Sequence, residues 1–502
     1  MNLAAVVILL PLALSVAIAL RARRGVTMDL AQWSVGGRGF SALLVFVLMA
    51  GELYTTFTFL GASGYAYGHG GAALYILVYT SLAFVMSYWL LPPIWRLARR
   101  HGAMTQPEIF AKVYDSPALG LLVAAVALLA LVPYLVVQMK GLGLIVEITS
   151  YGALSPAAAV WLGASVMTVY VMLSGIHGSA MTAVVKDVLV LVVCVFLGLY
   201  LPFHHYGGLG PMFDSIEAAR PGFLALAEPG RGGVWFLSTV ALSALGMYLW
   251  PHAFSAVFTA RTERSFRKNA VVMPLYALVM LFAMFAGYAA VLKVPGLSGG
   301  QIDLALLKLS LQTFDPWFVG VIGAAGMLTA LVPGSIMLIS ASTLLARNLY
   351  RPLHPGADDA RLMLVSRLGA PVLTLIAVAL TLRGGSSIVA LLLMGFGVVT
   401  QLAPALLCAL IGRPYANRYG VMAGIVVGVG FVAATVVSGA GTRELLPFAP
   451  AWVHQLNIGI VGLALNATVL LLVSRLTRGL AAPTPAPAAP TPPAHSHRSV
   501  CR

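Results

Sequence analysis

Long apolar stretches separated by short polar loops dominate the sequence. From them we predict thirteen membrane-spanning helices, at about residues 3–21, 41–68, 72–96, 117–146, 153–174, 178–201, 233–258, 271–293, 316–346, 362–383, 387–411, 419–439 and 452–475. A helix needs about 20 mostly apolar residues to cross a bilayer, because only helices and closed barrels satisfy every backbone N–H and C=O group in hydrocarbon. The stretches are continuous rather than alternating, which favours helices over a barrel. The sequence therefore predicts an all-α integral membrane protein.

The composition supports this fold class. Of 502 residues, 60% are hydrophobic and 9% are charged, whereas about 25% are charged in soluble globular proteins. The net charge of +15 does not indicate nucleic-acid binding, because the cations lie in short loops between apolar stretches, as membrane insertion requires. The three cysteines have no disulfide or metal-ligand spacing. We therefore expect the bilayer as the surroundings of the chain, and no nucleic acid, metal, cofactor or obligate protein partner.

The basic residues also predict a topology. The first apolar stretch has no basic residue before it, and Arg21, Arg23 and Arg24 follow it, so we interpret it as a retained helix rather than a signal peptide. Loops rich in Lys and Arg then alternate with loops that hold few. Since basic loops stay in the cytoplasm, we expect an external N-terminus and a cytoplasmic C-terminus in a bacterial inner membrane. Residues 479–502 are rich in Ala, Pro and Thr, which predicts a disordered tail after a transporter domain at 1–478.

Two of the predicted spans contain residues that interrupt helices. The second span holds Gly51, Gly61 and Gly64 around a Thr-rich segment, and the seventh holds Gly246 and Pro251. Broken helices five spans apart indicate an inverted repeat with the binding site where the half-helices meet. This divides the chain into an extra helix at 3–21, repeat one at 41–201, repeat two at 233–411 and peripheral helices at 419–475. The alternative is that these glycines only allow close helix packing.

Polar residues inside the spans are functional candidates, because charge is costly in a bilayer. Glu52 precedes the first break and could carry a proton, or it could only cap a half-helix. His252 follows the second break and could donate to an anionic substrate or relay a proton, or hydrogen-bond a neighbouring helix. Gln138 shares a helix face with Tyr134 at i, i+4, which could line a pocket or join two helices.

Three further charged residues lie in the spans. We expect Lys186 to reach into the helix bundle and Asp187 to meet a loop or backbone donor, because neighbouring side chains on a helix point about 100° apart. The alternative for Lys186 is that it extends to the membrane interface. Lys140 lies near the end of its helix, and we expect it to extend to the interface.

Three segments together resemble the sodium:solute symporter family, and within it the bacterial monocarboxylate permeases. They are Trp33-Ser34-Val35-Gly36-Gly37-Arg38, the glycine-broken helix from Gly51 to Tyr65, and the segment from Gly175 to Asp187. The resemblance implies the 5+5 inverted-repeat fold of the bacterial leucine transporter, with one extra N-terminal and two C-terminal helices, substrate between the broken helices and a cation beside the first. The expected substrate-binding residues are Tyr54, Thr55, Thr56, Gln138, Tyr248, Trp250 and His252, and the expected coupling residues are Glu52, Lys186 and Asp187.

The departures from the family pattern concern the coupling ion. Where sodium-coupled members place paired hydroxyls on the ninth span, this chain has Val332 and Pro333, which cannot ligate sodium, a cation that needs oxygen. The family's Thr-Asp-x-x-Gln on the sixth span begins here with Lys186, whose ammonium could replace the cation. Thr329, Ser335 and Ser340 lie close by, and a shift of one turn would restore a hydroxyl pair, so sodium remains an alternative.

The function predicted is a secondary active transporter, not an enzyme. We expect it to import a small monocarboxylate, such as lactate, pyruvate or acetate, by proton symport with Lys186 in place of the sodium ion. The alternative is sodium-coupled symport of another small organic solute such as an amino acid. A sensor, a channel and a membrane enzyme are rival classes. The sequence shows no signalling module after residue 475, no repeated filter and no nucleophile with its base.

Overall fold

The computed structural model describes residues 3–22, 29–226, 230–412 and 415–480, and helices form the regular structure of these ranges. The first half contains α1 (Leu3–Ala22), α2 (Leu30–Val35), α3 (Ala42–Leu53), η2 (Phe57–Gly61), α4 (Ala62–His69), η3 (Gly70–Leu74), α5 (Tyr75–His101), α6 (Gln106–Val113), α7 (Pro117–Thr149), α8 (Pro156–Tyr206), α9 (Leu209–Ala219), α10 (Gly233–Gly246), η4 (Met247–Leu249) and α11 (Pro251–Thr259). The second half contains α12 (Arg264–Ala277), α13 (Val279–Lys293), η5 (Gly299–Leu304), α14 (Ala305–Thr313), α15 (Pro316–Leu344), η6 (Leu345–Tyr350), α16 (Arg351–Leu353), α17 (Asp359–Arg383), α18 (Ile388–Val399), η7 (Thr400–Leu402), α19 (Ala403–Ile411), α20 (Arg418–Ser438), α21 (Thr442–Leu445), α22 (Ala451–His454) and α23 (Ile458–Leu476).

Many of these helices have the length and apolar composition of membrane-spanning helices. Ten described stretches are long and apolar enough to cross a membrane, and a further bent pair, α10 and α11, passes the same test jointly. The prediction of a polytopic all-helical membrane protein is therefore confirmed, whereas the number thirteen stays a prediction. Of the expected disordered tail at 479–502, only residues 479 and 480 fall among the described residues.

Both predicted helix breaks are present. α3 ends at Leu53, and the helix resumes at Phe57. α10 ends at Gly246 and α11 begins at Pro251, with a bend of 51° across the pair. Pro251 opens α11 because a proline at the first helical position loses no intrahelical hydrogen bond. A third interruption lies within α8, where Gly175 adopts φ 57° and divides the two spans predicted at 153–174 and 178–201.

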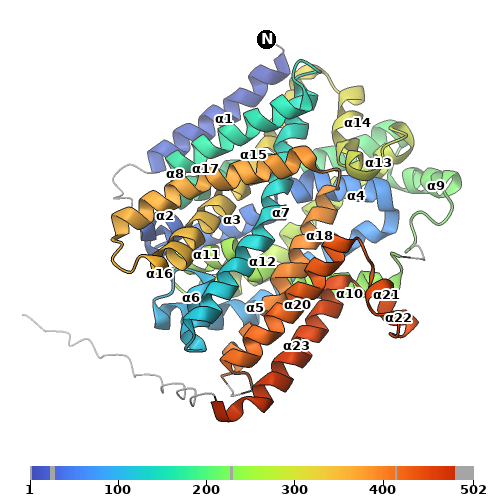
Figure 1. Ribbon diagram of the computed structural model, residues 1–502. Coiled ribbons are helices and arrows are strands. Elements are labelled where there is room, and N and C mark those ends of the chain that lie inside the picture. Colours follow the sequence, from blue (N-terminus) through green and yellow to red (C-terminus); the bar gives the residue numbers. More distant parts are fainter. Residues whose placement is uncertain (1–2, 23–28, 227–229, 413–414, 481–502) are drawn as a thin grey trace, which may run out of the picture.

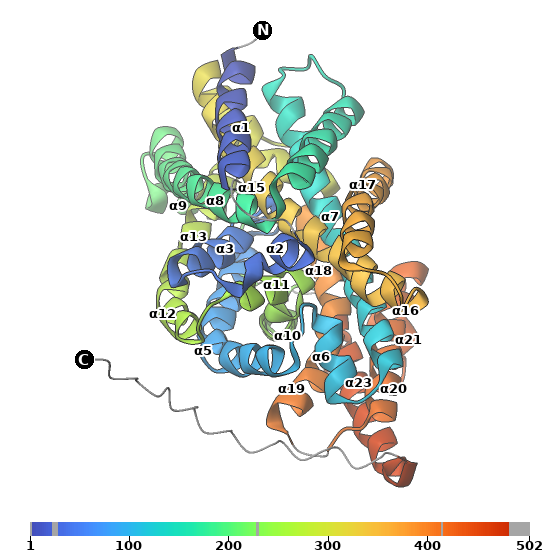
Figure 2. The same cartoon turned by 90° about the vertical axis from the view of Figure 1, so that its left-hand side faces the viewer.

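α15 is the most enclosed helix of the bundle. Every residue from Ile322 to Leu344 is buried, and α15 packs against α1, α7 and α8. α20 and α23 pack mainly against each other and lie together at one edge of the bundle, whereas α1 lies with α8 and α15 at the other end of both views (Figures 1 and 2). The first broken helix lies in the interior, whereas α7 and α10 of the second broken helix also contact the C-terminal pair.

The first break depends on a close approach of α7. A Cβ atom on Gly141 would lie 2.0 Å from Thr56 Cγ2, so only glycine allows α7 to pass this close to the unwound segment. Thr56 Oγ1 in turn donates a hydrogen bond of 3.1 Å to Gln138 Oε1, one turn earlier on α7. The break is therefore held in place from α7 by packing and by a hydrogen bond.

We expect Gly141→Ala to destabilise the fold by about 1–3 kcal/mol, because a methyl group forced into a filled space displaces its neighbours. The measurement is the thermal denaturation temperature of the detergent-purified protein. Gly430→Ala is the matched control, since Gly430 lies on α20 with no heavy atom within 4 Å of the added Cβ. Equal denaturation temperatures for the two variants would contradict this account of the contact.

Candidate functional site

A small cavity lies between the two broken helices. Its lining residues are Glu52 of α3, Phe57 of η2, Tyr79 of α5, Tyr134 of α7, Met247, Trp250, His252 and Ala253 of the second broken helix, and Leu392 and Phe396 of α18. Its volume is about 20 Å³, which is room for about one water molecule. Residues up to 344 positions apart in the sequence thus line a single small space where both helices are interrupted.

Polar atoms without protein partners converge on this cavity. Within the described part of the chain, Glu52 Oε1, Trp250 Nε1 and His252 Nδ1 are buried and make no hydrogen bond. Buried polar atoms are almost always paired, so each unpaired one calls for an explanation such as a ligand or water. One acceptor or acid and two ring nitrogens that face the same cavity are suited to hold a small polar molecule.

Aromatic rings form the rest of the wall. The Tyr134 ring lies 4.9 Å from that of Trp250 and 5.4 Å from that of His252, while Phe396 lies 5.4 Å from Trp250 and 5.6 Å from Tyr79, all between centroids. Apolar and aromatic walls with a few placed polar groups are typical of small-molecule sites. Sequence reasoning missed Tyr79 and Phe396, because an aromatic residue in a membrane span gives no signal that distinguishes lining from packing.

Lys186 lies beside the first break and is fully buried. Its ammonium donates to the carbonyl oxygens of Gly51 at 2.8 Å and Tyr54 at 2.9 Å. Those carbonyls are free because α3 ends here, and they carry the negative end of the helix dipole. Lys186 therefore reaches into the bundle as predicted, and the alternative, extension to the interface, is wrong.

The expectation for Asp187 is wrong. Asp187 does not turn to a loop or backbone donor, since its Oδ1 lies 2.8 Å from Lys186 Nζ. Although the two side chains leave the helix in different directions, the long flexible lysine stem brings the ammonium back to the neighbouring carboxylate. The three donors of Lys186 thus meet three oxygens, and its charge is compensated within the membrane.

The other predicted substrate contacts lie outside the cavity lining. Tyr54 donates its hydroxyl to the carbonyl oxygen of Tyr276, and Thr55 Oγ1 accepts from the backbone N–H of Phe57 at 3.1 Å. Thr56 is bonded to Gln138, and Tyr248 is buried but does not line the cavity. Of the predicted set, the structure brings Glu52, Trp250 and His252 together at the cavity, whereas the residues around Thr55 hold the break.

The hydroxyls of α15 considered as sodium ligands are engaged within the protein. Ser335 donates to the carbonyl oxygen of Val332 at 2.6 Å and lies 2.7 Å from the hydroxyl of Ser179. Ser340 donates to Ser255 at 3.1 Å, and Thr329 donates to a carbonyl on its own helix. These hydroxyls therefore join α15 to its neighbours in the present arrangement.

Lys140, which we expected to extend to the membrane interface, is held in an ion pair close to the ends of two helices. Its ammonium lies 2.6 Å from Asp303 Oδ2 and donates to the carbonyl oxygens of Gly300 at 3.0 Å and Ser386 at 2.8 Å. The same Asp303 oxygen accepts from the backbone N–H of Ile388 at 2.9 Å. This ion pair ties α7, η5 and the start of α18 together. Sequence reasoning missed Asp303 because it lies in a segment assigned to a loop.

A second ion pair lies at the other end of α7. Arg347 Nε is 2.6 Å from Glu108 Oε1, and joins η6 at the end of α15 to α6. Gln106, also on α6, donates to the carbonyl oxygen of Leu249 at 2.8 Å, next to the second break. Lys140 lies about 35 Å along α7 from its first residue, at 1.5 Å per residue. Charged contacts thus lie toward both ends of α7, the helix that contributes Tyr134 to the cavity.

The known proteins that this chain resembles in sequence or structure are symporters and transport proteins. A model described as "Sodium:solute symporter family" matches residues 33–428. The "Uncharacterized symporter YhjB" of Bacillus subtilis (strain 168) is 54% identical over 478 residues, which covers 95% of this chain and 98% of that protein. A "Monocarboxylate transport permease protein" of Rhizobium johnstonii is 28% identical, with 89% and 90% covered. The solved structure of a Na+-coupled sialic acid symporter superposes with a TM-score of 0.77 at 15% identity over 95% of this chain and 98% of that one, which shows a shared fold.

We expect Asp303→Asn to open the cavity on the side of Lys140, because the substitution removes the charge that holds three segments together. The measurement is the rate at which a membrane-impermeant maleimide labels Ala253→Cys, a cavity position, after Cys194, Cys408 and Cys501 are replaced by alanine. Labelling is expected to accelerate severalfold. Asp315→Asn, an exposed change between α14 and α15, should leave the rate unaltered. Equal rates in the two variants would show that the ion pair does not close the cavity.

Proposed function

Because the chain belongs to the sodium:solute symporter family, and is a membrane transporter of the symporter class rather than an enzyme, we propose that its substrate is a small monocarboxylate such as lactate, pyruvate or acetate. The observation that carries this proposal is the set of unpaired polar atoms in the cavity. Trp250 Nε1 and a protonated His252 Nδ1 can each donate to a carboxylate, and the start of α11 adds a favourable dipole. The named permease of Rhizobium johnstonii supports the same substrate class.

Glu52 makes proton coupling the favoured mode of energisation. A substrate carboxylate in this cavity lies beside the Glu52 carboxyl, and two negative charges so close in a water-poor space repel strongly. Entry of the anion together with a proton removes that repulsion, since one proton shared between the two carboxyls leaves a single charge. We therefore assign Glu52 the role of the proton carrier.

Lys186, beside the first helix break, also supports proton coupling. Its ammonium takes up two carbonyl oxygens and a carboxylate, the kind of oxygen ligands that a hard metal cation needs. A built-in cation at this place stabilises the broken helix without an ion from solution. We propose that the protein therefore needs no sodium, with Lys186 and Asp187 as positioning residues.

Sodium-coupled symport of another small organic solute, such as an amino acid, is the second candidate. It is supported by the fold shared with a symporter named as Na+-coupled and by the hydroxyls of Thr329, Ser335 and Ser340 on α15. A rearrangement that frees these hydroxyls would create oxygen ligands.

The finer architecture belongs to the same proposal. Thirteen crossings result if α1 and the bent pair count as spans and if α3 with α4 forms one span separate from α5. Repeat one then covers 41–201 and repeat two covers 233–411, with 3–21 and 419–475 outside the repeats. The charge bias of the loops supports an external N-terminus, a cytoplasmic C-terminus and a bacterial inner membrane.

The cavity must widen during transport. At about 20 Å³ it has room for about one water molecule, and the pairs Lys140–Asp303 and Arg347–Glu108 are both formed. We propose that these pairs open alternately, so that the cavity meets one side of the membrane at a time.

We expect Glu52→Gln to abolish pH-driven accumulation, because an amide cannot carry the proton. The measurement is uptake of labelled lactate into proteoliposomes under separate proton and sodium gradients. Glu147→Gln, a partly exposed change near the end of α7, should retain uptake. Proton-driven accumulation by Glu52→Gln would place the acid elsewhere. Uptake driven by sodium alone, without pH dependence, would overturn proton coupling and favour the second candidate.

We expect Lys186→Ser to abolish sodium-free uptake, because it leaves two carbonyls and Asp187 without their cation. Breaking a buried ion pair costs about 3–5 kcal/mol, so the denaturation temperature should also fall. Added sodium should partly restore both the uptake and the denaturation temperature, since the freed oxygens suit a hard cation. Lys293→Ser, at an exposed helix end, is the matched control. Full sodium-free uptake by Lys186→Ser would remove the proposed role of the lysine.

A further inference from the structure

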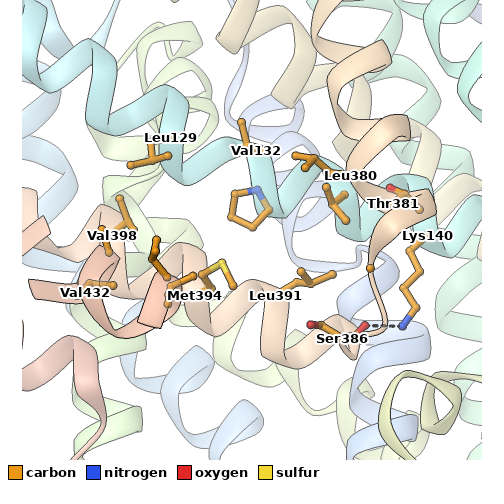
Figure 3. Close-up of a pocket in the computed structure, with 16 residues that line it drawn as sticks. Leu129, Val132, Lys140, Leu380, Thr381, Ser386, Leu391, Met394, Val398 and Val432 are labelled. Carbon is orange, nitrogen blue, oxygen red and sulfur yellow. Dashed lines mark hydrogen bonds between the residues drawn. The ribbon is translucent and has the colours of Figure 1, made fainter. Parts of the chain in front are cut away.

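A second cavity, larger than the central one, is a groove between α7, α17, α18 and α20. Its volume is about 380 Å³, within the usual range of small-molecule sites. Apolar side chains line most of it, among them Val132, Val136, Leu380, Leu391, Met394 and Val432 (Figure 3). All four helices are apolar enough to cross a membrane, so the groove lies at the depth of lipid hydrocarbon.

The surroundings and the size of the groove limit its occupant. Water does not settle in apolar cavities, and an empty space forfeits dispersion contacts along its walls. The volume of about 380 Å³ suits a slender occupant of small-molecule size. A flexible hydrocarbon chain from the bilayer meets each of these conditions.

The groove also has one polar end. Thr381, Ser386 and Lys140 line it there, with Val398 and Val432 at the opposite end (Figure 3). Lys140 is already neutralised by Asp303. Arg383, between the lining residues Thr381 and Gly384, is exposed, and no ion pair involves it among the residues whose positions are described. We propose that the groove binds one acyl chain of a membrane phospholipid, with an anionic headgroup beside Arg383.

The groove and the transport cavity share two walls. On α18, Leu392 and Phe396 face the cavity, whereas Leu391 and Met394 face the groove. On α7, Tyr134 lines the cavity, while residues two positions to either side line the groove. A chain in the groove therefore supports α7 and α18 from behind and favours the closed cavity. This coupling to transport, unlike the lipid site itself, rests on the proposed function.

Lipid retention tests the site without any substrate. The full-length protein is purified in mild detergent from vesicles of phosphatidylethanolamine and phosphatidylglycerol, and bound phospholipid is counted by native mass spectrometry. We expect the wild type to retain one phospholipid, enriched in phosphatidylglycerol, and Met394→Trp, which fills the groove, to lose it. Val132→Phe fills the groove from the opposite wall and gives a second variant if Met394→Trp does not fold.

The control is Val188→Trp. Val188 lies on α8 outside the groove, and the residue is 60% exposed. It should retain lipid as the wild type does, and Arg383→Gln should lose the preference for phosphatidylglycerol. Equal retention by wild type and both groove-filling variants would overturn the site. An unchanged lipid preference in Arg383→Gln would overturn the assignment of the headgroup.

Uptake in proteoliposomes with and without phosphatidylglycerol tests the coupling. We expect wild-type uptake to depend on that lipid and Met394→Trp uptake to be independent of it. Lipid-independent uptake by the wild type would overturn the coupling. Absence of lactate uptake in every lipid would count against the proposed substrate, whereas the retention result would stand by itself.

Discussion

The contact between the Lys186 ammonium and the end of α3 is the interaction on which the site depends. A helix that stops inside a membrane exposes carbonyl oxygens where no water can satisfy them. Here a buried lysine from α8 satisfies those of Gly51 and Tyr54, and Asp187 balances the charge. The unwound segment can therefore persist next to the cavity, and the side chain of Glu52 needs no part in holding it.

The sequence predicted the features that local chemistry determines. Both breaks were predictable because several glycines or a glycine and a proline occur close together there, whereas the single prolines Pro133 and Pro333 lie inside continuous helices. Lys186 stood out because a charge within an apolar stretch demands a partner. The family resemblance added that the two breaks meet, and the structure shows that Glu52 and His252, 200 positions apart, line one cavity.

Other features depended on the tertiary arrangement. Asp303 could not be assigned to Lys140 because it lies in a segment without periodic pattern, and only the fold brings η5 against α7. Asp187 was misassigned because the directions of two Cβ atoms do not determine where a long lysine side chain ends. Thr56 and Gln138 were both recognised as polar candidates, but their hydrogen bond to each other required the close approach of α7 at Gly141. Sequence patterns thus identified the polar candidate residues, but not the residues that they contact.

The short helix α6 connects the second helix break to the end of α15. Gln106 and Glu108 are two residues apart on α6. The first bonds the Leu249 carbonyl beside the second break, and the second pairs with Arg347 at the end of α15. A displacement of α6 large enough to separate one contact will strain the other. The short helix α6 is thereby coupled to the second helix break. A ligand or protein that binds α6 and displaces it would shift the backbone at Leu249 without contacting the cavity.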